Sequence, residues 1–277
     1  MPTPTPALRL AILASVLALV ALEALLLRWR RMPGYDWRES AVSAFIALGQ
    51  RLTLVAAGLL LWPAYQWVYA HRAFTVDLHS AAGLLALFIG VEFFYYWEHR
   101  LSHRVRWLWA THAVHHSPAR LNLSAAYRIG WTSLLSGIPL FLMPMMALGF
   151  APQAVLAMMG LNLLYQFWLH TELVPPLGLL DRVFNTPANH RVHHGSNDEY
   201  LDRNFGGVLM VFDHLFGTWQ RELPGIAPRY GLAGASAGAG PDYHPLRVAL
   251  GEWRRLVAAW CAAGSPMRRW RVLLGPP

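Results

Sequence analysis

The sequence predicts an all-α, polytopic membrane protein with about four to five transmembrane helices and a histidine-rich cap on the cytoplasmic side. Of its 277 residues, 55% are hydrophobic and only 14% are charged, and the mean hydropathy is +0.31. An ordinary soluble domain is less apolar than this. Three clusters of histidines stand at helical spacing near the ends of apolar runs, and they are the second reason for this interpretation.

Five apolar runs are each close to the ~20 residues that a helix needs to cross a bilayer. The motif DWRES before the second run predicts a helix start, with Asp36 as the N-cap and Glu39 reaching back to it. GFAPQ, between the fourth and fifth runs, predicts a tight turn. The five expected spans are residues 7–27, 41–61, 80–97, 131–150 and 152–169.

All 23 basic residues are arginines, and they flank the apolar runs. This placement is typical of topology signals and of contacts with lipid headgroups, and it does not favour a nucleic-acid partner. The loops after the first and third runs are rich in arginine, whereas the loops after the second and fourth runs carry few. The positive-inside rule therefore predicts a cytoplasmic C-terminus and places the histidine clusters on the cytoplasmic face.

Three parts of the chain follow from these patterns. Residues 1–79 form N-terminal transmembrane helices, residues 80–220 form the catalytic portion, and residues 221–277 form a linker and a C-terminal amphipathic helix. The glycine- and alanine-rich stretch at 231–242 is typical of a flexible linker. The helix after it either lies in the membrane interface or packs on the body of the protein.

The histidine clusters are HRLSH, HAVHH and HRVHH. On a helix, spacings of i, i+3 and i+4 place the imidazoles on one face, close enough to share a metal ion. A single pair of this kind is usually an ordinary surface or core feature, but three clusters on one side of a membrane are hard to explain by chance. All-imidazole ligation suits iron, zinc, copper or nickel, and eight histidines exceed the needs of one ion. The sequence therefore predicts two metal ions.

Several carboxylates accompany the histidines. Glu92 lies inside the third apolar run, where a carboxylate is costly, so it is a candidate catalytic residue. The alternative for Glu92 is a buried hydrogen bond between helices. Four further carboxylates are expected to orient the imidazoles and balance the charge of the metal ions: Glu98, Glu172, Asp198 and Asp202.

Three segments carry a resemblance to a known family: VEFFYYWEHRLSH, WATHAVHHSPARLNLSAAYR and FNTPANHRVHHGSNDEYLDRNFGGVLMVFDHLFGTW. Between about residues 83 and 219, the chain resembles the fatty acid hydroxylase/sterol desaturase superfamily of membrane di-iron enzymes, and most of all its alkylglycerol monooxygenase-like group. Glu92 stands where aspartate is frequent, and His214, where a basic residue is frequent, is not expected to be a ligand. The resemblance implies nine metal ligands: His99, His103, His112, His115, His116, His170, His190, His193 and His194.

The resemblance also implies a reaction. Two iron ions would use dioxygen to hydroxylate or desaturate a C–H bond of a lipid taken from the bilayer. Because no flavin, nicotinamide or cytochrome fingerprint is evident, the electrons are expected from a separate donor protein or a tetrahydropterin. Asn122, Arg128 and Asn204 are expected near the cavity, with loop hydrogen bonding as the favoured role. The alternatives are a membrane di-zinc hydrolase and a non-enzymatic metal-binding or metal-transport protein.

Overall fold

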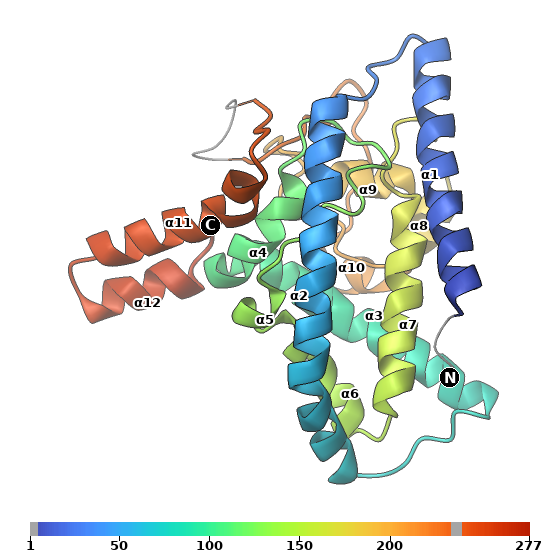
Figure 1. Cartoon of the computed structure of the whole chain (residues 1–277), viewed down its shortest axis with the longest axis vertical. Coiled ribbons are helices and arrows are strands. Elements are labelled where there is room, and N and C mark those ends of the chain that lie inside the picture. The colour runs from blue at the N-terminus through green and yellow to red at the C-terminus, as the bar shows by residue number, and fades with distance from the viewer. Residues whose placement is uncertain (1–4, 234–239) are drawn as a thin grey trace.

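The computed structural model describes residues 5–233 and 240–277. Within these residues the secondary structure is helical, apart from an isolated antiparallel bridge between Phe184 and Leu209. The long helices form an elongated bundle, and most of the shorter helices lie toward one end of it (Figure 1). The all-α prediction is confirmed.

Among the described residues, three helices are long and apolar enough to cross a membrane: α1 (Pro6–Trp29), α2 (Trp37–Ala70) and α3 (Ala81–Arg104). Asp36 caps α2 as predicted, because its Oδ1 accepts hydrogen bonds from the backbone N–H groups of Arg38 and Glu39. The Glu39 side chain does not reach back to the cap. Its Oε1 accepts the Ala119 N–H at 2.8 Å instead.

The fourth apolar run is not the single helix that was predicted. It consists of α5 (Ser133–Ser136), the 3-10 helix η1 (Ile138–Leu142) and α6 (Met143–Ala147). Gly137 ends α5 in the left-handed region at φ 83°, and prolines 139 and 144 lack the N–H that a continuous helix would use. The fifth run forms α7 (Pro152–Phe167), which has 16 residues. The number of membrane crossings therefore stays a prediction.

The α6–α7 turn lies beside the connection between α2 and α3. Ala73 N–H donates to the carbonyl of Ala147 at 2.9 Å, and Val76 N–H donates to that of Gly149 at 3.1 Å. Gly149 has φ 102°, and a Cβ there would stand 2.1 Å from the Phe74 carbonyl oxygen, so the turn requires glycine. The α6–α7 turn therefore lies at the same end of the bundle as the α2–α3 connection (Figure 1).

An apolar core fills the space between α2, α3, α6 and α7. Its most buried members include Leu87, Val91, Met145, Met146 and Val155. Because α3 belongs to this core and also carries the first histidine cluster at its far end, the packing of the bundle fixes the height and rotation of those histidines.

Helix α1 is attached differently. Only 11% of its apolar window is buried, yet Glu23 in its last third is buried at 3% exposure. The Glu23 carboxylate accepts the Leu123 N–H at 2.8 Å and also accepts the hydroxyls of Tyr35 and Thr171. A polar anchor therefore ties α1 to the end of the bundle where the histidines lie.

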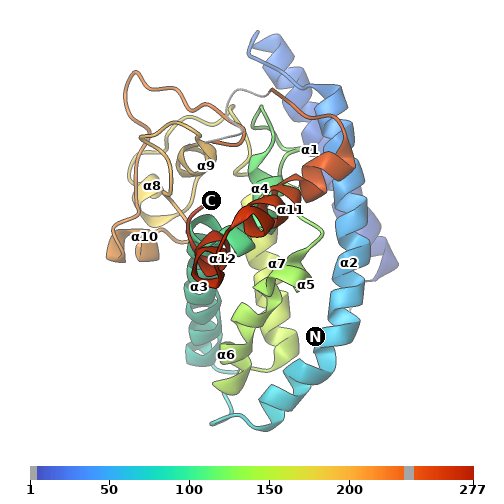
Figure 2. The same cartoon turned by 90° about the vertical axis from the view of Figure 1, so that its left-hand side faces the viewer.

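The C-terminal region forms α11 (Pro245–Ala262) and α12 (Pro266–Leu274), which cross the face of the bundle beside α4 (Arg106–His116) (Figure 2). Trp253 and Leu256 of α11 pack against Ala110 of α4, and Trp253 Nε1–H donates to Thr132 Oγ1 at 2.7 Å. Helix α11 therefore packs on the body of the protein. Residues 234–239 of the expected linker lie outside the described residues, and the domain boundaries stay predictions.

Candidate metal centre

Four segments bring histidines to one end of the bundle. The last two turns of α3 carry the first pair, and α4 follows after the single residue Val105 and carries the first triplet. The short helix α9 (Pro187–His194) carries the second triplet, and Thr186 caps it by accepting the Asn189 N–H. His170 follows the end of α7. The structure brings together all nine histidines expected to bind metal.

The nine histidines form two groups. Within each group, one candidate ligand nitrogen per residue lies within 4.8 Å of the others. Seven of the side chains are buried, whereas His112 in the first group and His115 in the second are partly exposed. The first group is His99, His103, His112, His116 and His193, and the second is His115, His170, His190 and His194.

Neighbouring Nε2 atoms nearly touch within each group. In the first group, His112 Nε2 lies 3.1 Å from the Nε2 atoms of both His99 and His116. In the second group, His190 Nε2 lies 3.0 Å from that of His170 and 3.1 Å from that of His194. Nitrogens that bind one metal ion at about 2.0–2.1 Å, as in zinc sites, stand roughly 2.8–3.4 Å apart in octahedral or tetrahedral geometry. The two groups therefore fit one ion each.

Backbone carbonyls orient several of the rings. The Nδ1–H groups of His99, His193 and His170 donate to the carbonyl oxygens of Phe205 at 2.9 Å, Arg203 at 3.0 Å and Gln166 at 3.0 Å, respectively. A neutral imidazole that donates from Nδ1 has a lone pair at Nε2. These lone pairs point into the two groups, which is unfavourable unless a cation is bound there.

The loop that supplies two of these carbonyls is itself fixed. Asp213, which is fully buried, accepts the N–H groups of Phe205 and Gly206, both at 2.8 Å. Asn204 adopts φ 56° and donates to the carbonyl of Asn189 at 3.0 Å. Asp213 was not among the residues expected from the sequence. Its signal was a carboxylate next to His214 in the mainly apolar segment VFDHLF.

Glu92, like Asp213, accepts backbone N–H groups of the loop that follows Asn204. Its Oε2 accepts the N–H groups of Val208 at 2.9 Å and Leu209 at 2.8 Å, and its Oε1 accepts a hydrogen bond from the Asn162 amide. Glu92 does not belong to either histidine group. These contacts favour the alternative of a buried structural hydrogen bond, and a catalytic role for Glu92 stays a prediction.

The other expected carboxylates differ in their surroundings. Asp202 Oδ1 lies 3.9 Å from His103 Nδ1, which makes it the carboxylate nearest a ring. Glu98 accepts the Ser102 hydroxyl at 2.7 Å, Glu172 accepts the Tyr230 hydroxyl, and Asp198 is exposed. Orientation of the rings therefore depends more on backbone carbonyls than on carboxylates.

The polar residues expected near the cavity brace loops. Asn122 Oδ1 accepts the N–H and hydroxyl of Ser124 at 3.0 and 2.7 Å. Arg128 is fully buried and lies 3.4 Å from Glu39. His214 lies apart from both groups, because its Nε2 bonds to the Arg182 carbonyl at 2.9 Å.

The electrostatics of the site favour neutral imidazoles. Burial lowers the pKa of His115 to about 4 and holds the pKa values of His112, His116, His170 and His190 well below 6.5. Neutral imidazole is the form that binds a metal ion. The histidines are therefore in the ligating state at neutral pH.

Comparison with known families finds a match over the segment that carries the histidines. Residues 84–218 match the model of the family described as Fatty acid hydroxylase, a segment that contains all nine histidines. This segment therefore carries the sequence signature of the fatty acid hydroxylase family.

Alkylglycerol monooxygenases are among the most similar relatives. The human protein is 41% identical over 195 residues, which are 69% of this chain and 40% of the relative. That of Danio rerio is 46% identical over 145 residues, or 52% of this chain and 32% of the relative. Ornithine lipid hydroxylase OlsE of Rhizobium tropici is 33% identical over 53% of this chain and 44% of the relative. The matched part therefore covers less than half of each of these relatives. None of the solved structures matches the chain.

Proposed function

We propose that the chain is a membrane-bound di-iron oxidoreductase that uses dioxygen to hydroxylate a C–H bond of a lipid. The observation that carries this proposal is the pair of histidine groups, each with ligand nitrogens within 4.8 Å of one another, at the end of an apolar bundle. The relatives named as a monooxygenase and a lipid hydroxylase support hydroxylation over desaturation.

Iron bound by these nitrogens would supply the activation of dioxygen and the removal of hydrogen from an unactivated C–H bond. The chain holds the nine imidazoles in place through α3, α4, α9 and the end of α7. The backbone carbonyls of Phe205, Arg203 and Gln166 hold the Nδ1 protons of three rings. Each Nε2 lone pair is thereby kept directed at the metal position, and partners of this kind typically contribute ~10–100-fold to metal affinity or activity.

The nine histidines differ in their exposure to solvent. Seven histidines are buried, and the two partly exposed rings belong to different groups, His112 to the first and His115 to the second. Both lie on α4, so this helix marks the side from which a substrate reaches both metal positions. The packed apolar core between α2, α3, α6 and α7 ends below the same end of the bundle, which suits a lipid substrate that is held at the membrane surface.

The orientation in the membrane and the electron donor belong to the same proposal. The arginine-rich loops favour a cytoplasmic face for the histidines. A reductant must then come from the cytoplasm, as a donor protein or as a tetrahydropterin. The distribution of arginines supports this arrangement, and the alkylglycerol monooxygenase relatives make a pterin the first donor to test.

The test measures metal, oxygen and product together. The full chain, purified anaerobically in detergent, is expected to hold about two iron ions. With 1-O-alkylglycerol, a tetrahydropterin and ¹⁸O₂, it is expected to form a product that carries one ¹⁸O atom, and an ornithine lipid serves as the second substrate arm. Two zinc ions with no oxygen uptake, combined with hydrolysis of the lipid, would contradict the proposal in favour of a hydrolase.

A further inference from the structure

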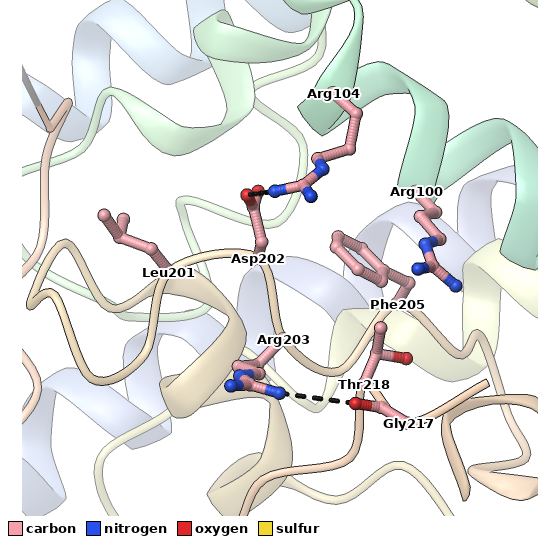
Figure 3. A pocket seen from close by; sticks show the side chains of 8 residues that line it. All are labelled: Arg100, Arg104, Leu201, Asp202, Arg203, Phe205, Gly217 and Thr218. Atoms are coloured by element: carbon pink, nitrogen blue, oxygen red, sulfur yellow. Dashed lines mark hydrogen bonds and ion pairs between the residues drawn. The ribbon is translucent and has the colours of Figure 1, made fainter. Parts of the chain in front are cut away.

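A cavity of about 260 Å³ opens between the end of α3 and the loop that orients the histidines. Three arginines line it: Arg100 and Arg104 from α3, and Arg203 from the loop. Figure 3 shows Arg100 and Arg104 on one side of the cavity and Asp202 and Arg203 on the other. Its volume is far larger than a single water needs.

The charge in this three-arginine pocket is unbalanced. Asp202 is the only carboxylate among its lining residues, and it pairs with Arg104. Arg100 donates to the Tyr96 hydroxyl at 2.9 Å, and Arg203 donates to the Gly217 carbonyl at 3.3 Å. In the described part of the chain, no carboxylate forms an ion pair with either of them. Two guanidinium groups therefore face the cavity with most of their N–H donors available.

Guanidinium forks match the geometry of phosphate oxygens, and charge-assisted hydrogen bonds of this kind are stronger than neutral ones. Thr218 also lines the wall, but its hydroxyl donates to the buried Asp213 at 2.7 Å, so the arginines are the groups that would contact the phosphate. We propose that the three-arginine pocket binds a phosphate group, carried either by a lipid headgroup or by a soluble phosphate compound. Phosphate binding by this pocket does not depend on the identity of the metal. A role of the bound phosphate in turnover rests on the proposed function.

The pocket lies directly beside the metal centre. Asp202 Oδ1 is 3.9 Å from His103 Nδ1, and the ring of Phe205, which lines the pocket, is centred 5.2 Å from that of His103. A bound phosphate would thus be separated from the first histidine group by one layer of side chains.

The surroundings favour a lipid as the source of the phosphate. The Arg100 guanidinium lies 5.5 Å from the centre of the Trp97 ring, where the apolar part of α3 ends. On the adjacent α10 (Val211–Leu215), Val211 and Leu215 are 48% and 69% exposed. Arginine and tryptophan next to exposed apolar side chains are typical of the headgroup level of a bilayer.

The experiment measures binding without turnover. The full chain in an uncharged detergent is titrated calorimetrically with inorganic phosphate and glycerol 3-phosphate at low ionic strength. Saturable binding is expected, and the double variant Arg100→Gln/Arg203→Gln should weaken it by at least about tenfold, since each charged hydrogen bond is worth about that much. The matched control is Arg254→Gln/Arg268→Gln, which removes the same charge from exposed positions of α11 and α12 and should bind as the unmodified chain does.

A second variant, Asp202→Asn, tests the proposal even if the double variant does not fold. It removes the competing carboxylate and frees Arg104, so phosphate should bind several-fold more tightly, a gain that misfolding cannot produce. Dihexanoyl phosphatidic acid and flavin mononucleotide separate the two sources, because the tighter ligand identifies a lipid or a soluble phosphate. No saturable binding, or equal binding by the unmodified chain and the double variant, would overturn the proposal whether or not the chain proves to be a hydroxylase.

Discussion

The Nδ1–H of His99 donates to the carbonyl oxygen of Phe205 at 2.9 Å, across 106 positions of the chain. This bond joins the end of α3 to a loop that Asp213 holds through two backbone N–H groups. The candidate metal centre therefore depends on residues that are not expected ligands, as well as on its histidines.

The first prediction compares two histidines outside the clusters. His170→Ala should lose iron and turnover by at least ~10–100-fold, because loss of a direct ligand costs no less than loss of a partner that orients one. His214→Ala should keep most of both, since its ring bonds to the Arg182 carbonyl outside both groups. Iron per chain and product formation, measured at matched folding, check this. A His170→Ala protein with full iron and activity would remove His170 from the site.

The second prediction separates catalysis from positioning at Glu92. An essential general acid or base typically contributes 10²–10⁴-fold, so Glu92→Gln should lose that much if Glu92 transfers a proton. We expect a smaller loss, because a glutamine oxygen can still accept the Val208 and Leu209 N–H groups. Glu92→Ala should instead lower the melting temperature and the iron content together. The pH profile of turnover is the deciding measurement, and a lost ionisation in Glu92→Gln would support catalysis.

The third prediction concerns acid and the metal-free chain. The folded pKa of His115 is about 4, below its ordinary value of 6.5, so the unfolded chain binds more protons between these values. Stability should therefore be full above about pH 6.5 and fall as the pH drops toward 4. Each proton taken up on unfolding steepens the fall by about 1.4 kcal/mol per pH unit. Thermal unfolding of metal-free protein across this range checks the sign, and stability that rises on acidification would contradict it.

The fourth prediction concerns topology. Because residues 73 and 76 bond to residues 147 and 149, reporters inserted at these two connections should both read external. A reporter after Pro277 should read cytoplasmic, as the arginine distribution predicts. Opposite readings at the two connections would mean that the α6–α7 turn does not reach the far side of the bilayer. A cytoplasmic reading at both would reverse the proposed orientation of the histidines.

The sequence alone was sufficient to predict that the clustered histidines come together, because their spacing on a helix is a local property. The positions 99/103, 112/115/116 and 190/193/194 each lie on one helix face, and the structure adds only how the faces meet. His170 is in no cluster, and its position directly after the fifth apolar run, the neighbouring Glu172 and the family resemblance pointed to it. How the nine divide into five and four depends on how α3, α4, α7 and α9 pack, which spacing alone does not reveal.

Other features depend on long-range contacts that leave a weak trace in the sequence. Hydropathy predicted one helix at 131–150 because Gly137 and two prolines scarcely change an apolar average, although they break the helix. The carbonyls of Arg203 and Phe205 orient imidazoles, and a backbone carbonyl has no residue signature. Asp213 was overlooked for a similar reason, since its partners are backbone N–H groups.

Helix α1 looks like a simple membrane tether until Glu23 is considered. Its carboxylate receives the backbone N–H of Leu123 and the hydroxyl of Thr171, and Thr171 is the residue after His170. If α1 were deleted or exchanged for an unrelated anchor, these donors would be left buried without an acceptor, at a cost of roughly 1–3 kcal/mol each. The first helix is therefore not an interchangeable module, and a truncated enzyme that still reaches the membrane would carry a defect beside its metal centre.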